Sequence, residues 1–302
     1  MEEFYMKKNT LKLIVSALLI TMIGGSMVGC GSGEDKGHTG NNSTNGSITV
    51  SGSSALLPLM EQSIEKFNEI NPGAEISAQA GGSGTGLTQV LEGTVDIGNS
   101  DIFAEEKLDE AQSKELVDHK VIAQGFGIVV NKSLGITNLN KEQLKGIFSG
   151  KITNWKEIGG PDKEIFLIHR KSGSGTRGTF ENKILDGDKS LENDSIGAVQ
   201  DSNGAVLTTM KQNDGAISYL ALSYMNTAEA KELLQVTNID GISSENENIK
   251  NGSYPFWSWG HMYTNGEAEG LSKEFINFIT SEDNKESIEN LGFISGSEIK
   301  EK

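Results

Sequence analysis

Three times along this chain, a β-prone run ends in a turn of Gly, Ser and Thr that opens a helical pattern. The turns are Gly52–Ala55, Gly81–Gly86 and Ser172–Thr176. Free backbone N–H groups and hydroxyls at a helix start bind anions, and glycine lets the backbone approach closely. An ordinary helix cap would also explain any one of these turns. Together they predict an α/β fold whose ligand lies at the carboxyl ends of strands.

Strand and helix patterns alternate from Ile48 onward, which predicts doubly wound, mostly parallel sheets. Strands are expected at 48–51, 74–80, 95–98, 121–130, 165–168, 215–220 and 254–263, and helices at 56–70, 87–91, 144–148 and 271–279. The pattern restarts after residues 131–135, which indicates a second lobe. We therefore expect lobe I at 48–131 plus 250–302, lobe II at 135–249, and hinge crossings at 132–134 and about 248–252.

The first thirty residues have the pattern of a secretory signal. Three lysines precede an apolar run at 13–23, and small residues then lead to Cys30. The apolar run is too short to span a bilayer, which needs about 20 residues. The segment resembles the lipobox of bacterial lipoproteins, although Met27 stands where Leu is usual. We expect a signal peptide at 1–30, lipid attachment at Cys30 and a flexible tether at 31–47; an ordinary secretory signal is the alternative.

Composition excludes several classes of protein. The chain has 42 acidic and 26 basic residues, for a net charge of −16, which argues against nucleic-acid binding. One cysteine excludes an intrachain disulfide framework and a multi-cysteine metal site. The four histidines lack metal-ligand spacing, and neither a nucleotide P-loop nor a Gly-x-Ser-x-Gly elbow is present. We therefore expect no metal, no cofactor and no enzymatic activity.

Two charged residues stand at the ends of predicted strands. Arg170 comes just before the third turn, where its guanidinium could grip an oxyanion; a surface ion pair is the alternative. Asp101 closes the third strand, where a carboxylate suits only an anion that carries a proton. Its alternative is a helix N-cap before 104–106.

Several stretches, taken in order, resemble the phosphate-binding proteins of bacterial phosphate ABC transporters. They are 51–54, 80–86, 96–101, 147–155 and 170–177, and the resemblance extends from Ile48 to about Ile294. It implies a two-lobed, periplasmic-binding-protein-like fold of type II that closes on phosphate in the cleft between its lobes. Each lobe would be a doubly wound, mostly parallel sheet.

The resemblance also implies roles for individual residues. Asp101 would accept the proton of bound phosphate, and Arg170 would pair with its charge. The remaining ligands would be hydroxyl and amide donors from the three turns, namely Ser53, Ser54, Ala55, Ser83, Ser174, Gly175 and Thr176. Arg177 would support the site without touching the ligand, Trp155 would be a core residue, and Trp257 and Trp259 would pack near the crossing.

The function implied is that of a monomeric, lipid-anchored receptor on the extracellular face of the cell membrane. It would bind inorganic phosphate and deliver it to the permease and ATPase subunits of an ABC importer. A receptor for sulfate or molybdate, a secreted hydrolase using Ser83 or Ser174 as nucleophile, and a phosphate sensor or adhesin are the alternatives.

Overall fold

The computed structural model describes residues 45–299, so the predicted signal peptide, Cys30 and most of the predicted tether lie outside the described residues. The first strand begins at Gly46, so the last two residues assigned to the tether belong to the sheet, where Ser47 pairs with Glu75. Within 45–299, no helix is both long and apolar enough to cross a membrane.

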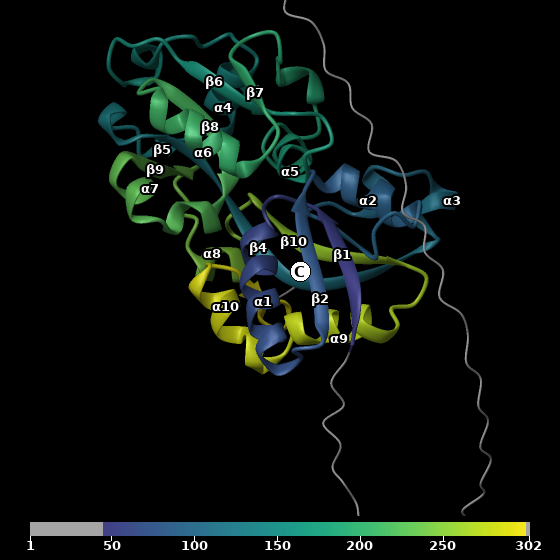
Figure 1. The fold of residues 1–302 in the computed structure, drawn as a ribbon. Coiled ribbons are helices and arrows are strands. Elements are labelled where there is room, and N and C mark those ends of the chain that lie inside the picture. Colours follow the sequence, from purple (N-terminus) through teal and green to yellow (C-terminus); the bar gives the residue numbers. More distant parts are fainter. Residues whose placement is uncertain (1–44, 300–302) are drawn as a thin grey trace, which may run out of the picture. The chain divides into compact units, whose positions relative to one another are not determined.

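The order of elements follows the predicted alternation (Figure 1). The strands are β1 Gly46–Gly52, β2 Ala74–Ala80, β3 Ile97–Ser100, β4 Leu116–Asn131, β5 Asn138–Leu139, β6 Phe166–Arg170, β7 Ala198–Gln200, β8 Ala216–Ala221, β9 Leu234–Ile239, β10 Trp257–Asn265 and β11 Ile294–Ser295. The helices are α1 Leu57–Ile70, α2 Ser83–Leu91, α3 Glu110–Ser113, α4 Lys141–Phe148, α5 Gly175–Lys183, α6 Asn203–Gln212, α7 Ala228–Leu233, α8 Asn246–Lys250, α9 Gly270–Ile279 and α10 Lys285–Asn290. Short 3₁₀ turns join several of them. Each predicted strand and helix overlaps an observed one.

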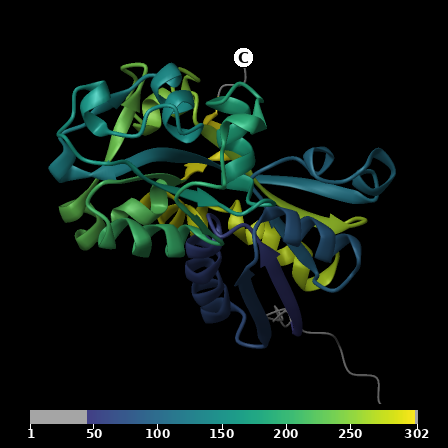
Figure 2. The same ribbon diagram turned by 90° about the horizontal axis from the view of Figure 1, so that it is seen from above.

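The first lobe is built on the parallel strands β2, β1 and β3, with β10 antiparallel beside β3. Its core joins the two ends of the described chain, since Phe67 of α1 packs edge-on against Phe275 and Phe278 of α9, with ring centroids 5.5 and 5.3 Å apart. Figures 1 and 2 both show the yellow C-terminal helices beside the purple and blue N-terminal elements. The predicted return of the C-terminal helix to the first lobe is confirmed.

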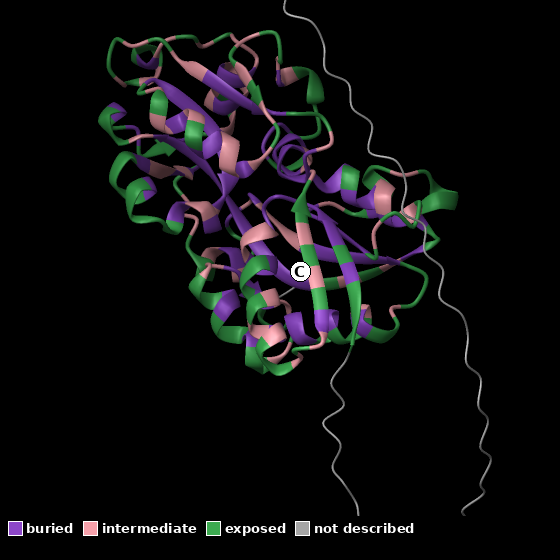
Figure 3. Ribbon diagram, viewed as in Figure 1, coloured by how far each residue is buried: buried purple, intermediate pink, exposed green. Residues whose placement is uncertain are grey.

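The second lobe is built on the parallel strands β8, β6 and β7. Its core is aromatic, with the Phe180 ring stacked on Tyr219 at 4.3 Å and tilted against Phe148 at 4.6 Å. Trp155 is fully buried in this core and its Nε1 donates to the carbonyl of Gly215 at 2.9 Å, which confirms the prediction of a core residue. In Figure 3 the strands at the centre of both lobes are mostly coloured as buried, while the helices carry exposed outer faces.

Strand β4 belongs to both lobes. Its residues 116–125 pair with β10, and its residues 126–131 pair antiparallel with β8 and β9. The two sheets are thus connected through antiparallel strands, while the outer strands of each lobe are parallel. The partner changes at Gly125 and Phe126, well before the 3₁₀ turn Lys132–Leu134 at the predicted first crossing. The predicted lobe boundaries remain a prediction.

Candidate anion site between the two lobes

Asp101 lies directly after β3 and is only 2% exposed. Its Oδ1 accepts hydrogen bonds from the Ser53 hydroxyl and from Gln124 Nε2, the latter at 2.8 Å. Its Oδ2 accepts from the Thr176 hydroxyl at 3.3 Å, and its backbone N–H donates to Ser83 Oγ at 2.9 Å. Three loops far apart in sequence therefore meet at one buried carboxylate.

Burial dominates the electrostatics of this carboxylate. Loss of solvent raises the pKa of Asp101 above its ordinary value of 3.8. The hydrogen bonds from Ser53 and Gln124, the charge of Arg170 and the bond from Thr176 oppose that rise. All of these groups favour the ionised form, which can accept a proton-bearing ligand oxygen.

Arg170 ends strand β6 and is 1% exposed. Its Nη2 donates to Ser54 Oγ and to the carbonyl of Asp201, each at 3.2 Å. Its Nε and Nη1 are buried and have no hydrogen-bond partner among the described residues. Burial lowers the pKa of this guanidinium from its ordinary value, which nearby Tyr219 and Asp101 counteract. A buried cation with two unused N–H groups suits an anionic partner.

The first turn is held from the second lobe. Ser54 Oγ accepts from the backbone N–H of Asn203 at 3.1 Å and from its side-chain Nδ2 at 3.0 Å, in addition to Arg170. The hydroxyl of Tyr224 donates to the Ser54 carbonyl at 2.8 Å. Ala55 is fully buried and its N–H donates to Ser53 Oγ at 3.0 Å.

The third turn opens helix α5 against the second turn. Ser174 is the N-cap of α5, with its hydroxyl oxygen accepting from the N–H of Arg177 at 3.3 Å. Gly175 lies so close to the first lobe that an added Cβ would be 2.1 Å from Ser83 Oγ. The N–H of Gly84 donates to the carbonyl of Gly173 at 2.9 Å. Direct contact between the two turns closes the cleft here.

The structure brings all nine predicted binding residues to this one region. Sequence analysis missed Gln124, Asn203 and Tyr224. A signal existed for Gln124, because it is a lone amide inside an apolar strand. A signal also existed for Asn203, because Ser202, Asn203 and Gly204 follow strand β7 and open helix α6, as in the three turns selected. No comparable signal marks Tyr224.

Comparison with known proteins identifies the family. A sequence profile described as the PBP superfamily domain matches residues 37–283. The phosphate-binding protein PstS of Bacillus subtilis is 46% identical over 289 residues, which cover 94% of this chain and 92% of that protein. The chain belongs to the PstS family.

More distant PstS relatives and solved structures agree. The PstS protein of Borreliella burgdorferi is 26% identical over 82% of this chain and 89% of its own. A crystal structure of a putative phosphate ABC transporter substrate-binding protein with bound phosphate, from Clostridium perfringens, matches with a TM-score of 0.75 and 29% identity, covering 83% of this chain and 99% of that one. An ABC-type phosphate transport receptor from Vibrio cholerae matches with a TM-score of 0.65 and 29% identity, covering 82% and 99%. These matches confirm the two-lobed PstS fold.

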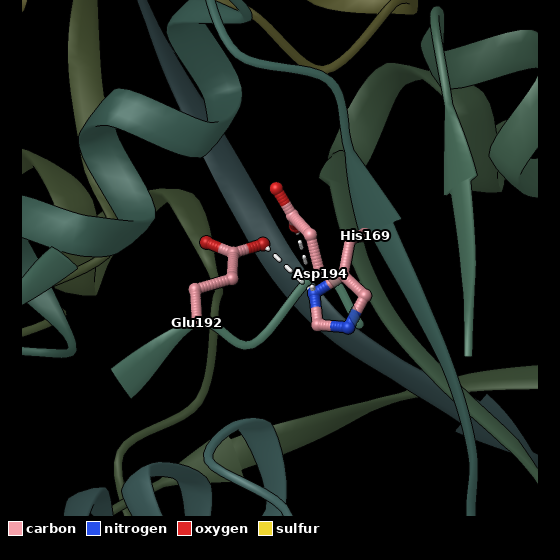
Figure 4. Close-up of side chains that lie close together, drawn as sticks. All are labelled: His169, Glu192 and Asp194. Carbon is pink, nitrogen blue, oxygen red and sulfur yellow. Dashed lines mark hydrogen bonds and ion pairs between the residues drawn. The ribbon is translucent and has the colours of Figure 1, made fainter. Parts of the chain in front are cut away.

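A second polar cluster lies behind Arg170 in this PstS fold (Figure 4). Figure 4 shows Glu192 and Asp194 directed at the same ring nitrogen of His169, with Nδ1 3.1 Å from Glu192 Oε1 and 4.0 Å from Asp194 Oδ1. These donor types could hold a metal ion. However, Nη1 of Arg177 lies 2.8 and 2.9 Å from the two oxygens of Asp194. A guanidinium already supplies the positive charge, so we interpret the cluster as an ion-pair network.

This network fixes the backbone of Arg170. The N–H of Arg170 donates to the Tyr219 hydroxyl at 3.3 Å, and that hydroxyl donates to Glu192 at 2.5 Å. The carbonyl of Arg170 accepts from Arg177 Nη1 at 2.7 Å. Arg177 also pairs with Glu181 at 2.7 Å, so its charge is used within the second lobe. Arg177 therefore holds the backbone of Arg170, which agrees with the supporting role that the resemblance implies for it.

A cavity of about 320 Å³ adjoins the site and is lined in part by Asp101, Phe103, Trp257 and Trp259. The two tryptophan rings meet edge to face, with centroids 5.9 Å apart. Both belong to β10 beside β4, near the point where β4 changes lobes. Their packing there agrees with the expected structural role.

Proposed function

We propose that this PstS-family chain is a receptor that binds inorganic phosphate between its two lobes for an ABC importer. The observation that carries this is Arg170, whose buried Nε and Nη1 have no partner among residues 45–299. It shares the site with a buried carboxylate and with the hydroxyls of three turns. A tetrahedral oxyanion that also carries a proton satisfies both charges.

The roles follow from the contacts. Arg170 would neutralise the phosphate charge, and the N–H groups at the start of α5 would add donors from Gly175 and Thr176. Asp101 would accept the phosphate proton through Oδ2, which has a single, 3.3 Å partner against two for Oδ1. The net charge of −16 repels phosphate, so these local dipoles and one cation must hold it.

The hydroxyls of the first two turns have internal partners in this structure. Ser53 donates to Asp101, and Ser83 accepts from the N–H of the same residue. We include both in the binding set, along with Ser54 and Ser174, because a hydroxyl can rotate to donate to a ligand while its oxygen still accepts. Ala55 belongs to the set through its backbone N–H, which donates to Ser53 Oγ at 3.0 Å in this structure.

We further propose that the chain is attached to the outer face of the cell membrane through a lipid on Cys30, and that it acts as a monomer. Two acyl chains on one cysteine suffice for stable anchoring. The permease and ATPase subunits of the importer would be its protein partners. The basic, apolar and small-residue pattern of residues 1–30 supports this location.

The alternatives fit the site less well. Sulfate and molybdate carry no proton at neutral pH, so Asp101 would face another acceptor. A hydrolase would need a base beside its nucleophile, yet Ser83 and Ser174 each accept a backbone N–H. Membership of the PstS family also favours a transport receptor over an enzyme.

Calorimetric titration of the full chain, freed of bound ligand, tests the proposal. We expect one phosphate to bind per chain and sulfate to release no heat. Absence of phosphate binding, or equal binding of sulfate, would contradict it and assign the site to another ligand.

A further inference from the structure

Three N–H groups converge on one hydroxyl oxygen in the closed cleft. Ser54 Oγ lies 3.0 Å from Asn203 Nδ2, 3.1 Å from the Asn203 backbone nitrogen and 3.2 Å from Arg170 Nη2. Asn203 is fully buried and is the first residue of α6, so its backbone N–H is one that the helix leaves unpaired. Two of the three donors thus belong to a residue that sequence analysis did not select.

The direction of the Asn203 side chain is fixed by its other end. Its Oδ1 accepts from the backbone N–H of Ala221 at 2.9 Å, at the end of β8. A reversed amide would place its NH₂ group against that N–H and would lose both hydrogen bonds. Asn203 Nδ2 must therefore face Ser54.

A serine hydroxyl has two acceptor sites and one hydrogen to donate. The three N–H donors share these two acceptor sites, so neither site is free to accept from a further group. The hydroxyl hydrogen of Ser54 must point away from all three, and it has no acceptor within that group. By donating to the Ser54 oxygen, Asn203 leaves the Ser54 hydroxyl hydrogen directed outward, where it can donate to an anion.

A second contact from the same lobe holds this residue. The Tyr224 hydroxyl donates to the Ser54 carbonyl at 2.8 Å, and burial raises the pKa of Tyr224 to about 12, so the hydroxyl keeps its proton at neutral pH. The first turn of the first lobe is thus held by two residues of the second, Asn203 and Tyr224, besides Arg170.

We infer that Asn203 is a positioning residue for anion binding. It orients the Ser54 hydroxyl toward the bound phosphate and holds the first turn against the second lobe when the cleft is closed. This inference rests on the proposed phosphate site. It adds helix α6, which carries none of the predicted binding residues, to the parts of the chain that set affinity.

A double-mutant cycle on the full chain tests whether Asn203 acts through Ser54. The variants are Asn203→Ala, Ser54→Ala and the double variant, each titrated calorimetrically with inorganic phosphate. We expect each single change to raise Kd about tenfold, the effect of losing one hydrogen bond to a charged ligand. The double variant should also lose about tenfold rather than a hundredfold, because one hydrogen bond is lost in all three.

The isosteric variant Asn203→Asp separates positioning from packing. It keeps the acceptor for Ala221 but replaces Nδ2 with an acceptor, so the Ser54 hydroxyl would donate to Asp instead of phosphate. We expect a larger loss of affinity than for Asn203→Ala, with a higher dissociation rate. Ser202→Ala is the matched control, because it removes the N-cap of α6, whose oxygen accepts from Ala205, without touching Ser54. It should lower Tm but leave Kd within about twofold.

The outcomes are distinguishable. Additive losses in the double variant, or Asn203→Asp binding as tightly as the wild type, would overturn the inference while leaving the phosphate site in place. A wild-type chain that fails to bind phosphate would overturn the proposed function and this inference together.

Discussion

The two lobes supply opposite charges to the site, and the two charged groups differ in how many hydrogen-bond partners each has within the protein. In the first lobe, the Asp101 carboxylate accepts hydrogen bonds from three side chains, so it is well satisfied without a ligand. In the second lobe, the Arg170 guanidinium keeps two buried nitrogens unpartnered among the described residues. The guanidinium has N–H groups available to an anion. The carboxylate is fixed in position, where it can accept a hydrogen bond only from an anion that carries a proton. Affinity should therefore come mainly from the second lobe and selectivity from the first.

The largest expected effect is on selectivity, and it tests the first lobe. Asp101→Asn replaces an acceptor with an amide that can donate to a fully ionised oxyanion. Sites built around one hydrogen bond reject analogues that lack it by about 10⁴-fold, so we expect the phosphate-to-sulfate ratio of affinities to fall by about that factor. Competition titrations with both anions measure the ratio. An unchanged ratio would remove Asp101 from its role as selector.

The next effect tests the second lobe. Arg170→Ala removes two charge-assisted hydrogen bonds to phosphate, and we expect Kd to rise about a hundredfold or more. Lys171→Ala is the matched control, since it removes the same charge from the next residue, whose side chain is exposed. Calorimetry should show Kd within about twofold of wild type for the control. Similar losses in both variants would mean that general electrostatic attraction, rather than the buried guanidinium, sets affinity.

A third prediction concerns the contact between the lobes. Gly175→Ala would place a Cβ 2.1 Å from Ser83 Oγ and 2.8 Å from Asp101 Cβ, so the cleft could not close fully. We expect Kd to rise about tenfold, chiefly through faster dissociation. Gly178→Ala, on the same helix, meets only a methyl of Ile102 at 3.3 Å and should have a smaller effect. Stopped-flow measurement of both rates distinguishes them; equal effects would show that closure at Gly175 is not limiting.

The smallest effect is a pH dependence of stability. Because burial raises the folded-state pKa of Asp101 above 3.8, the ionised form is disfavoured in the folded, ligand-free protein. This contribution lowers stability as the pH rises above about 3.8 and levels off above the raised pKa. Asp101→Asn lacks it, so the variant should gain stability relative to wild type over that interval. Parallel Tm curves for the two proteins would contradict the assigned cause.

Much of this site was predictable because its residues lie in local patterns. Asp101, Arg170 and the three turns stand at strand ends, and a parallel sheet brings such ends together. The sequence could not show which groups face one another across the cleft. Asn203 meets Ser54 across 149 residues, and nothing local in either segment requires that contact. Contacts of this kind depend on how the two lobes pack.

The same limit applies to the fold. The apolar run at 121–130 predicts a buried strand, and the structure contains it as part of β4. Periodicity cannot show that one strand serves two sheets, so the change of partner at Gly125 and Phe126 was not foreseen. The tether predicted at 31–47 includes two residues of the sheet for a similar reason. Gly46 and Ser47 have the composition of a linker, but they pair with β2.

The interleaving of the lobes also sets the order in which they can fold. The first-lobe core unites residues 48–97 with Val121, Ile122 and residues 262–293, so it forms only when the two ends of the described chain come together. The buried aromatic residues of the second-lobe core all lie between residues 126 and 256, although Ala55, Ala123 and Ile294 complete the same cluster. Closing long loops slows the formation of distant contacts, so the second lobe should fold first. The apolar faces of the N-terminal strands would then stay exposed until the C-terminal helices pack against them.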